Sequence, residues 1–525
     1  MLFIDIFIYI KSKKNIKVIY YINKIMDEIA TYLGKKGYTI KKENLEIKEQ
    51  VEIRKDLMAT PFVPKSSPIK PISFPIYRES SKKFYIPRFY GIETYGEPDM
   101  NKLKDGKSIK LSFKGKLRDY QEPIVDAYMK HAKIKGSGLL EIHTGGGKTV
   151  LALKIIELLK QKTLIIVHKE FLMRQWRERI LEFLPDAKIG KIQGSVIDVE
   201  NKDIVLGMLQ SLSKKEYDST IFEEFGFTII DETHHISSQV FSRVLFKVVT
   251  KYAVGLSATL KRSDGLTKVI KMFLGEVVYK KERKGENDVL VKSIHYETND
   301  EEFNELKLDW RGNIAYSSMI KKICEYNPRR DFVLKVLEDM LEDKINKQIM
   351  ILGHNKSILF YLHDAIKHRG LATVGYYIGG MKEKDLKISE GKKVIIATYA
   401  MAEEGLDIKT LTSLIMCTPK VNITQAVGRI LRCKENKSTI IDIIDPHIIF
   451  KKQYNKRKTI YKKQKFKLIE TTMRGYENNE WDTILSYDNN KKLNKKMNNK
   501  RNRIIINTKK ENIFEQGKCL LDMNY

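Results

Sequence analysis

A glycine-rich segment between a short apolar run and an amphipathic helix has the clearest chemistry in this sequence. Residues 138–159 read GLLEIHTGGGKTVLALKIIELL. Glycines allow the backbone to turn its N–H groups inward, and the helix that follows adds partial positive charge at its N-terminus. Lys148 is expected to reach the β- and γ-phosphates of a nucleotide, and Thr149 to bind Mg²⁺. The loop that would surround the phosphates consists of His143, Thr144, Gly145, Gly146 and Gly147.

Two adjacent carboxylates follow an apolar run further along the chain. Residues 225–230 (FGFTII) end on Asp231 and Glu232. Hydrolysis of a nucleoside triphosphate needs a metal ion, a group that polarises the attacking water, and cations near the γ-phosphate. We predict that Asp231 holds Mg²⁺, directly or through water, and that Glu232 polarises the water. His234 and His235 lack the spacing of a zinc site.

Two arginines in the last third of the chain could supply the cations. QAVGRILR (425–432) places Arg429 and Arg432 three residues apart, on one side of a predicted helix. Guanidinium groups that face the phosphate loop across a cleft would stabilise charge in the transition state. Taken alone, this pattern is more often a basic helix face. Its occurrence in a chain that also has a phosphate loop and a carboxylate pair favours the functional interpretation, and opening and closing of the cleft would then couple hydrolysis to motion.

The elements that must position these residues alternate between strands and helices. A helical pattern at 356–368 separates two strands of the second half of the chain. Strand patterns occur at 163–167, 204–208, 225–230 and 252–256, and again at 348–352, 393–397, 413–416 and 439–443. Because polar residues follow several of these strands, we predict an α/β fold with two parallel sheets and functional residues at the carboxyl ends of the strands.

Charge and cysteine content restrict the class of protein. Among 525 residues, Lys and Arg exceed Asp and Glu by 96 − 66 = 30. Such an excess favours a polyanionic partner such as nucleic acid, although a lysine- and asparagine-rich composition accounts for part of it. The four cysteines (Cys324, Cys417, Cys433, Cys519) show no CxxC spacing, so we expect neither a zinc site nor a disulfide framework but a reducing, intracellular compartment.

The N-terminal residues do not predict a membrane protein. MLFIDIFIYI is shorter than the roughly 20 residues of a membrane span, and basic residues follow it instead of preceding it. We therefore expect a soluble protein, with Met26 as the hypothetical true start. The predicted segments are a non-native extension (1–25), an accessory domain (26–110), a first, ATP-binding lobe (111–285), a linker (286–327), a second lobe (328–450) and a basic, partly disordered tail (451–525) that attracts phosphate backbones loosely.

The motifs occur in an order that resembles superfamily 2 helicases of the DExH type, over about residues 115–450. The similar motifs are LRDYQ (117–121, Q motif), HTGGGKT (143–149, motif I), VHKEFLMRQW (167–176, Ia), DETH (231–234, II), SAT (257–259, III), ATYAMAEEGLDI (397–408, V) and QAVGRILR (425–432, VI). GLSATLKRSDG (255–265) and LRDYQ are most similar to the XPB-like branch. The whole pattern resembles in particular the transcript-release DNA helicases of poxviruses and other large cytoplasmic DNA viruses, and so does the stretch from GYTI to IRKDLMATPF (37–62). Ile142 in place of the first loop glycine and Thr233 in place of alanine are departures that do not argue against hydrolysis.

The resemblance implies two RecA-like lobes, ATP and Mg²⁺ as cofactors, and roles for further residues. Gln121 would read the adenine edge, and Gly405 and Asp407 would lie near the nucleotide. Coupling of hydrolysis to strand movement would involve a His234–Gln425 contact across the cleft, together with Ser257 and Thr259. The strand-binding face, which would contact mostly backbone phosphates regardless of sequence, would include Lys169, Arg174, Gln210, Ser211 and Thr398.

The predicted function is that of an ATP-dependent DNA helicase or translocase, 3′-to-5′ by resemblance, in transcription (transcript release) or repair. An RNA helicase remains an alternative, because the motor core does not by itself distinguish DNA from RNA. A nucleic-acid-binding scaffold with a degenerate ATPase is a non-enzymatic alternative. The expected partners are nucleic acid and transcription machinery, with no membrane. A viral protein of this kind would act in the host cytoplasm or the virion.

Overall fold

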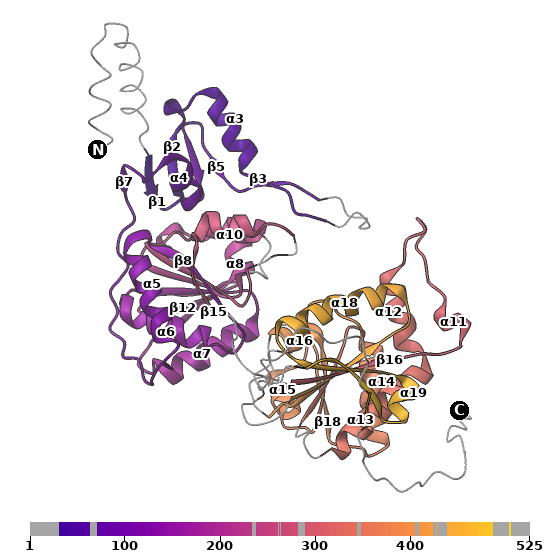
Figure 1. The fold of residues 1–525 in the computed structure, drawn as a ribbon. Helices are drawn as coiled ribbons and strands as arrows, with labels where there is room; N and C mark the ends of the chain where they lie inside the picture. The colour runs from indigo at the N-terminus through magenta and orange to yellow at the C-terminus, as the bar shows by residue number, and fades with distance from the viewer. Residues whose placement is uncertain are drawn as a thin grey trace, which may run out of the picture. The chain divides into compact units, whose positions relative to one another are not determined.

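The structure is a computed structural model that describes residues 31–63, 71–233, 238–260, 262, 264–281, 289–343, 348–404, 408, 410–423, 427, 438–486 and 503–505. The chain divides into two compact units, residues 1–283 and 284–525 (Figure 1). The proposed start at Met26 and the predicted extension before it lie outside the described residues. None of the described helices combines the length and apolarity that crossing a membrane requires.

The first unit begins with a small sheet in the order β5-β6-β2-β1-β7, antiparallel except for the β1–β7 pair. Two helices, a short 3₁₀ turn and a separate β3–β4 hairpin accompany it. The elements are β1 (Thr31–Gly34), β2 (Gly37–Lys41), η1 (Lys42–Asn44), α3 (Ile47–Asp56), β3 (Met58–Ala59), β4 (Phe74–Pro75), β5 (Arg78–Glu79), β6 (Lys83–Ile86), α4 (Arg88–Tyr95) and β7 (Met100–Asn101).

The main sheet of the first unit has eight strands in the order β11-β10-β12-β9-β13-β14-β8-β15. All neighbours are parallel except β10 and β11. The strands are β8 (Ser137–Ile142), β9 (Thr163–Val167), β10 (Ile189–Gln193), β11 (Val196–Asp198), β12 (Ile204–Met208), β13 (Phe227–Ile230), β14 (Tyr252–Ser257) and β15 (Val277–Lys281). Strands β9, β12 and β13 are buried along their whole length, as expected when helices cover both faces of a parallel sheet.

Two apolar clusters cover the two faces of this sheet. One contains side chains of α5 (Glu122–Lys135), α6 (Lys148–Leu159) and α7 (Glu170–Phe183). The other contains side chains of α8 (Leu209–Lys214), α9 (Ser238–Leu245) and α10 (Thr267–Leu274), and it continues into the small N-terminal sheet through Tyr38, Phe84 and Ile86. A short 3₁₀ turn, η2 (Ser219–Phe222), precedes β13. The N-terminal residues therefore share a core with the first lobe.

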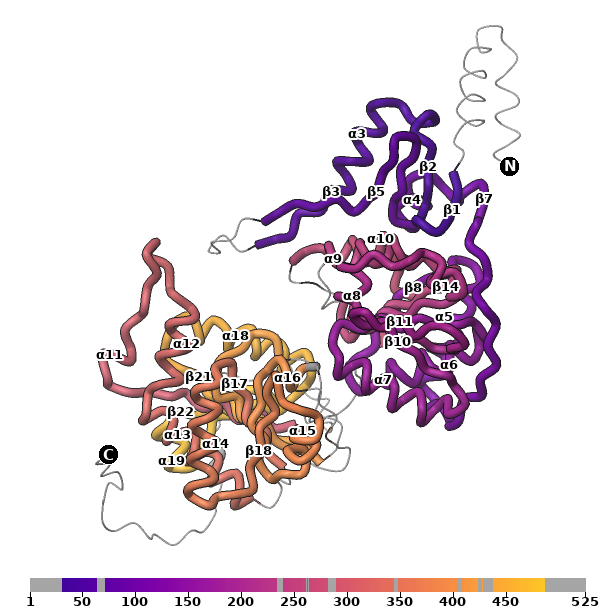
Figure 2. Tube along the Cα trace, turned by 180° about the vertical axis from the view of Figure 1, so that it is seen from behind, coloured from indigo at the N-terminus to yellow at the C-terminus, as the bar shows by residue number. Residues whose placement is uncertain are grey.

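The second unit contains one mixed sheet in the order β18-β19-β17-β20-β21-β16-β22-β23-β24, parallel from β18 to β22. Figure 2 shows each unit from the opposite side. The strands are β16 (Val289–His295), β17 (Ile349–Gly353), β18 (Val374–Tyr377), β19 (Val394–Thr398), β20 (Ser413–Met416), β21 (Ser438–Ile444), β22 (Lys467–Thr472), β23 (Glu480–Leu485) and β24 (Arg503–Ile505).

Helices cover both faces of the second sheet as well. Side chains of α12 (Tyr316–Glu325), α13 (Asn327–Glu342) and α14 (Lys356–His368) pack in one apolar cluster, and those of α15 (Glu383–Glu390), α16 (Tyr399–Glu404) and α18 (Ile448–Lys463) contribute to another. Two short helices, α11 (Glu301–Asn304) and α19 (Met473–Glu477), also contribute side chains to the first of these clusters. The predicted α/β fold with two parallel sheets is confirmed.

Two predicted boundaries differ from the structure. Strand β16 falls in the predicted linker (286–327), yet it pairs with both β21 and β22 inside the second sheet. Residues 451–485, assigned to the basic tail, instead form most of α18 together with β22, α19 and β23. Lysines dominate this stretch and obscure the helical spacing of its buried side chains, which are Phe450, Tyr454, Arg457 and Tyr461.

Candidate active site

The phosphate loop joins β8 to α6 at the carboxyl edge of the first sheet. Gly145 and Gly147 have φ angles of +81° and +82°, a region that side chains disfavour. A Cβ atom on Gly147 would lie 2.3 Å from the Nε2 atom of Gln121, so a side chain has no room there. The sequence thus folds into a loop that turns sharply before the first residue of α6, Lys148.

Ile142 occupies the position where the first loop glycine is usual. Its side chain is fully buried, and a Cβ atom on Gly146 would lie 2.6 Å from its Cγ2 atom. The Gly146 N–H donates to the carbonyl oxygen of His143 at 3.0 Å, which closes the turn. The substitution is therefore accommodated by an apolar contact beneath the loop, because Gly146 leaves space for the isoleucine.

Gln121 braces the same loop from the start of α5. Its amide Nε2 donates to the carbonyl oxygen of Gly146 at 3.3 Å, while its Oε1 accepts from the backbone N–H of Arg118 at 2.9 Å. The side chain is only 3% exposed. Gln121 therefore lies against the phosphate loop. The adenine contact that the resemblance implies stays a prediction.

Lys148 forms an ion pair with Glu232. Its Nζ atom lies 2.8 Å from Glu232 Oε1, and the two side chains are 12% and 21% exposed. Glu232 has a φ angle of +47°, a left-handed conformation that costs a non-glycine residue about 1–3 kcal/mol. Strain of this kind concentrates at functional sites, because the surrounding structure must hold it in place.

Asp231 is the buried member of the carboxylate pair. Burial, followed by the nearby negative charge of Glu232, raises its pKa to about 6, although Lys148 and a hydrogen bond from Trp176 act in the opposite direction. The Trp176 Nε1–H donates to Asp231 Oδ2 at 2.8 Å. Asp231 Oδ1 accepts the backbone N–H of Glu232 at 2.9 Å, which supports the strained backbone of that residue.

Trp176 is a residue of this site that the sequence alone did not single out. It lies on α7 and is 2% exposed, within the apolar cluster on one face of the first sheet. In the sequence it reads as one more apolar residue at helical spacing with Leu172 and Ile180. The only available signal was its indole N–H, since a buried tryptophan usually needs a hydrogen-bond acceptor.

The carboxylate pair suits a divalent cation. Two carboxylates are adjacent in the sequence and in space, and burial together with the charge of Glu232 raises the pKa of Asp231. Oxygen ligands from a carboxylate and a hydroxyl are those that Mg²⁺ prefers, and it usually keeps several waters as well. Asp231 and Thr149 are the residues that would hold the ion. No group of three or more His, Cys, Asp or Glu side chains that could hold a metal ion occurs among the described residues.

Strand β14 runs beside β13, with Gly255 opposite Ile230, and so brings Ser257 and Thr259 to the same sheet edge as the carboxylates. The Ser257 hydroxyl donates to the carbonyl oxygen of Thr259 at 2.6 Å, and the side chain of Ser257 is fully buried. The coupling role of these two residues stays a prediction.

The predicted strand-binding residues of the first unit also lie at this edge. Strands β9 and β12 are parallel neighbours, and Lys169 and Arg174 follow the first, Gln210 and Ser211 the second. Gln210 Nε2 donates to the carbonyl oxygen of His168 at 2.7 Å, and Ser211 Oγ accepts the N–H of Gly194 at 2.9 Å. The structure therefore places Gln210 beside His168, the residue before Lys169, and the strand-binding role of the four residues stays a prediction.

The predicted residues of the second unit are only partly described. Thr398 is the last residue of β19, at the carboxyl edge of the second sheet. His234 of the first unit and five predicted residues of the second, Gly405, Asp407, Gln425, Arg429 and Arg432, lie outside the described residues. Their roles stay predictions.

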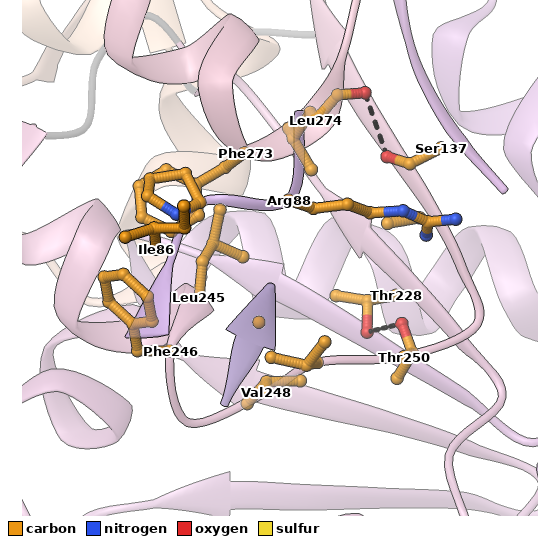
Figure 3. A pocket seen from close by; sticks show the side chains of 14 residues that line it. Ile86, Arg88, Ser137, Thr228, Leu245, Phe246, Val248, Thr250, Phe273 and Leu274 are labelled. Carbon is orange, nitrogen blue, oxygen red and sulfur yellow. Dashed lines mark hydrogen bonds between the residues drawn. The ribbon is translucent and has the colours of Figure 1, made fainter. Parts of the chain in front are cut away.

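A cavity lies at the seam between the N-terminal sheet and the first lobe, away from the phosphate loop (Figure 3). Its lining is mostly apolar, and the Thr250 hydroxyl donates to Thr228 Oγ1 at 2.9 Å. Arg88 reaches past it and donates to the carbonyl oxygen of Lys251 at 3.3 Å. Burial lowers the pKa of Arg88 to about 10, so it stays charged at neutral pH. This lining offers no carboxylate or nucleophile, and we do not assign it to the reaction.

Comparison with known proteins gives consistent relatives. Residues 114–262 match the family described as type III restriction enzyme, res subunit. A "Putative ATP-dependent RNA helicase" of Acanthamoeba polyphaga mimivirus is 35% identical over 456 residues, which cover 84% of this chain and 87% of that protein. A "Putative helicase" of Invertebrate iridescent virus 6 is 27% identical over 368 residues, 68% of this chain and 83% of the relative.

An archaeal protein extends the comparison beyond viruses. The "DNA 3'-5' translocase XPB2" of Sulfurisphaera tokodaii is 26% identical over 421 residues, which cover 70% of this chain and 90% of that protein. The chain belongs to the ATP-hydrolysing helicases of superfamily 2, in the XPB-like branch that includes helicases of large DNA viruses.

Proposed function

We propose that this helicase is an ATP-dependent DNA helicase or translocase. The observation that supports its motor chemistry most directly is the cluster of Lys148, Asp231 and Glu232 beside the glycine loop. A cation for the phosphates, a carboxylate for Mg²⁺ and a second carboxylate for water are the groups that phosphoryl transfer to water requires. All three side chains come from the carboxyl edge of one sheet.

The ion pair suggests how nucleotide binding prepares the site. Lys148 Nζ donates to Glu232 Oε1 at 2.8 Å and so compensates its charge. The β- and γ-phosphates of ATP would compete for the same ammonium group and would release Glu232 to orient the attacking water. Mg²⁺, held by Asp231 and Thr149, would supply charge neutralisation at the phosphates. Gln121 would select adenine while it braces the loop.

The second unit would complete the reaction. We propose that Arg429 and Arg432 act as arginine fingers, that Gly405 and Asp407 lie near the nucleotide, and that Gln425 contacts His234. Hydrolysis would then require both units, and each catalytic cycle would move them relative to each other. The moving strand would be contacted by the residues at the two sheet edges, namely Lys169, Arg174, Gln210, Ser211 and Thr398.

DNA is the substrate we favour, for one reason. The stretch GLSATLKRSDG resembles the XPB-like branch, and the archaeal relative of that branch is named a DNA translocase. The mimivirus relative is named an RNA helicase, which makes RNA the competing substrate. We further propose a role in transcript release or repair, with transcription machinery as a partner and the host cytoplasm or virion as the site of action.

The test is ATP hydrolysis by the wild type and by Glu232→Gln, with single-stranded DNA, duplex DNA or RNA added. We expect DNA to stimulate the wild type more than RNA does. Glu232→Gln should lose at least about 100-fold in turnover with every polymer, because it removes the group that polarises water. Stronger stimulation by RNA than by duplex DNA would overturn the choice of DNA.

A further inference from the structure

Helix α18 has an unusual distribution of charge. Its sequence, IIFKKQYNKRKTIYKK, contains six lysines, one arginine and no acidic residue. Every other described helix of ten or more residues contains at least one Asp or Glu. A basic composition spread evenly over the chain does not account for a helix from which carboxylates are missing.

The inner face of α18 fixes the orientation of the helix on the second sheet (Figure 1). Arg457 donates to Asp442 on β21 through Nε and Nη2, each at 2.8 Å, and the Tyr461 hydroxyl donates to the same carboxylate at 2.8 Å. Tyr454 is buried on this face as well. Because these side chains are locked, the opposite face is held rigidly towards solvent.

The outer face consists almost entirely of lysines. The exposed residues of α18 after Ile448 are polar or basic: Lys451, Lys452, Asn455, Lys456, Thr459, Lys462 and Lys463. Lys452 and Lys456 stand one turn apart on the same side. From Lys451 to Lys463 the row of charges extends about 18 Å along the helix axis.

Helix stability does not explain the lysines near the start of this row. Cations stabilise the last turn of a helix, which accounts for Lys462 and Lys463, but they are unfavourable near the first turn, where Lys451 and Lys452 lie. Lys452 and Lys456 also repel each other, at a cost of about 0.2–0.5 kcal/mol for such a pair. An external anion would turn these unfavourable charges into favourable contacts.

The position of α18 matches the proposed motor surface. The helix follows β21, and β19, β17, β20 and β21 are parallel neighbours. Its N-terminal end therefore starts from the same sheet edge that carries Thr398. A nucleic-acid strand that contacts this edge would have a continuous path along the row of lysines.

We propose that the outer face of α18 (Lys451, Lys452 and Lys456, extended by Lys462 and Lys463) is a second contact for the phosphate backbone of nucleic acid, outside the motor motifs. The inference rests on the proposed function. A protein partner is disfavoured, because protein interfaces are depleted in lysine and centred on apolar or aromatic residues. Ile448, at the first position, is the one large apolar residue exposed on α18.

The experiment compares two triple variants of the full chain. The test variant is Lys451→Gln/Lys452→Gln/Lys456→Gln. The matched control is Lys382→Gln/Lys384→Gln/Lys387→Gln, which removes the same charge from the same unit. These three lysines lie on α15 and on the residue before it, with Glu383 and Asp385 between them and Glu390 after them. Affinity for a long single-stranded DNA of mixed sequence is measured as a function of salt concentration.

We expect the test variant to bind more weakly at low salt, with a log–log salt slope reduced by about 2, since each lost contact to a single strand removes about 0.7. The difference should vanish at high salt, and ATP hydrolysis without nucleic acid should stay unchanged. Lys451→Arg/Lys452→Arg/Lys456→Arg should bind like the wild type, which shows that charge, not folding, is responsible.

Three results would overturn the proposal. A test variant with the affinity and salt slope of the wild type would mean that the lysines serve another partner, such as an acidic protein. Equal losses in the test and control variants would reduce the effect to net charge. Both outcomes leave the proposed function intact. A wild type that binds no nucleic acid at any salt concentration would instead reject the proposed function together with this inference.

Discussion

Both units bury charged side chains beside their parallel strands, but they compensate those charges in opposite ways. In the first unit, Glu232 pairs with Lys148, and the pKa of Asp231 is raised to about 6 by burial and by its neighbour Glu232. In the second unit, Arg457 forms two hydrogen bonds with Asp442, both at 2.8 Å, and both side chains are 1% exposed.

A second pair strengthens the contrast. Arg329 and Asp445 are fully buried, and Arg329 Nη2 donates both to Asp445 Oδ2 at 2.9 Å and to the carbonyl oxygen of Cys417 at 2.8 Å. These charges are balanced and satisfied within the fold. In the first unit, burial and the charge of Glu232 raise the pKa of Asp231, and Glu232 has a strained backbone. The second unit therefore pairs Asp442 and Asp445 each with an arginine, whereas the first unit places two carboxylates side by side in a strained turn.

The largest effect should come from breaking a balanced pair. Arg457→Met leaves Asp442 charged and buried, which typically costs about 3–5 kcal/mol. We expect the second unit to lose that much stability, measured by hydrogen exchange of its peptides. Lys456→Ala, the exposed neighbour, is the control and should change little.

A double variant distinguishes pairing from packing. Arg457→Met combined with Asp442→Leu removes both charges, and replacing a whole buried pair by apolar residues is often close to neutral. Stability should therefore recover relative to Arg457→Met alone. If the double variant were less stable than either single variant, the pair would not be the balanced unit described above.

A smaller effect is expected from removing the donor to Asp231. Trp176→Phe deletes the indole N–H that lies 2.8 Å from Asp231 Oδ2 and keeps an aromatic ring in the core. We expect turnover of ATP to fall about 10-fold, equivalent to about 1.4 kcal/mol. The control is Trp310→Phe, because Trp310 in the second unit is 85% exposed. Equal rates for the two variants would contradict the assigned role of Trp176.

The smallest effect concerns pH. His354 Nε2 contacts the carbonyl oxygen of Pro419 at 3.1 Å, and burial, helped by Lys420, lowers the pKa of this histidine. Below about pH 6.5, the ordinary pKa of histidine, the unfolded chain therefore binds more protons than the folded one, so stability falls as the pH falls towards the lowered pKa. His354→Gln should lose less stability between pH 7 and pH 5.5, measured by urea unfolding. An identical pH dependence in both proteins would refute this.

The regular elements of both sheets could be predicted from the sequence. Strands such as β9 and β12 are continuous apolar runs, and α14 has its predicted bounds, because burial on both faces leaves a strong pattern. The glycine loop and the two carboxylates were also predictable, because each of their residue types is required by the chemistry.

The other features of the fold and of the site could not be predicted, because most of them depend on contacts between distant parts of the chain. Nothing local marks Trp176 as the donor to Asp231, since the partners are 55 residues apart. Likewise, β16 is recognised as a strand of the second sheet only through its neighbours β21 and β22. Lysines concealed the buried side of α18, because the arginine that anchors it resembles the rest of the basic run. The positive φ of Glu232 has no sequence signal at all.

The most direct test of the proposed roles of Lys148 and Glu232 separates nucleotide binding from hydrolysis. Binding of a fluorescent ATP analogue with Mg²⁺ and steady-state turnover are measured for the wild type, Lys148→Ala and Glu232→Gln. We predict that Lys148→Ala loses both binding and turnover, and that Glu232→Gln binds at least as tightly as the wild type but hydrolyses at least about 100-fold more slowly. Wild-type turnover by Glu232→Gln, or unaltered binding and turnover by Lys148→Ala, would contradict this account of the site.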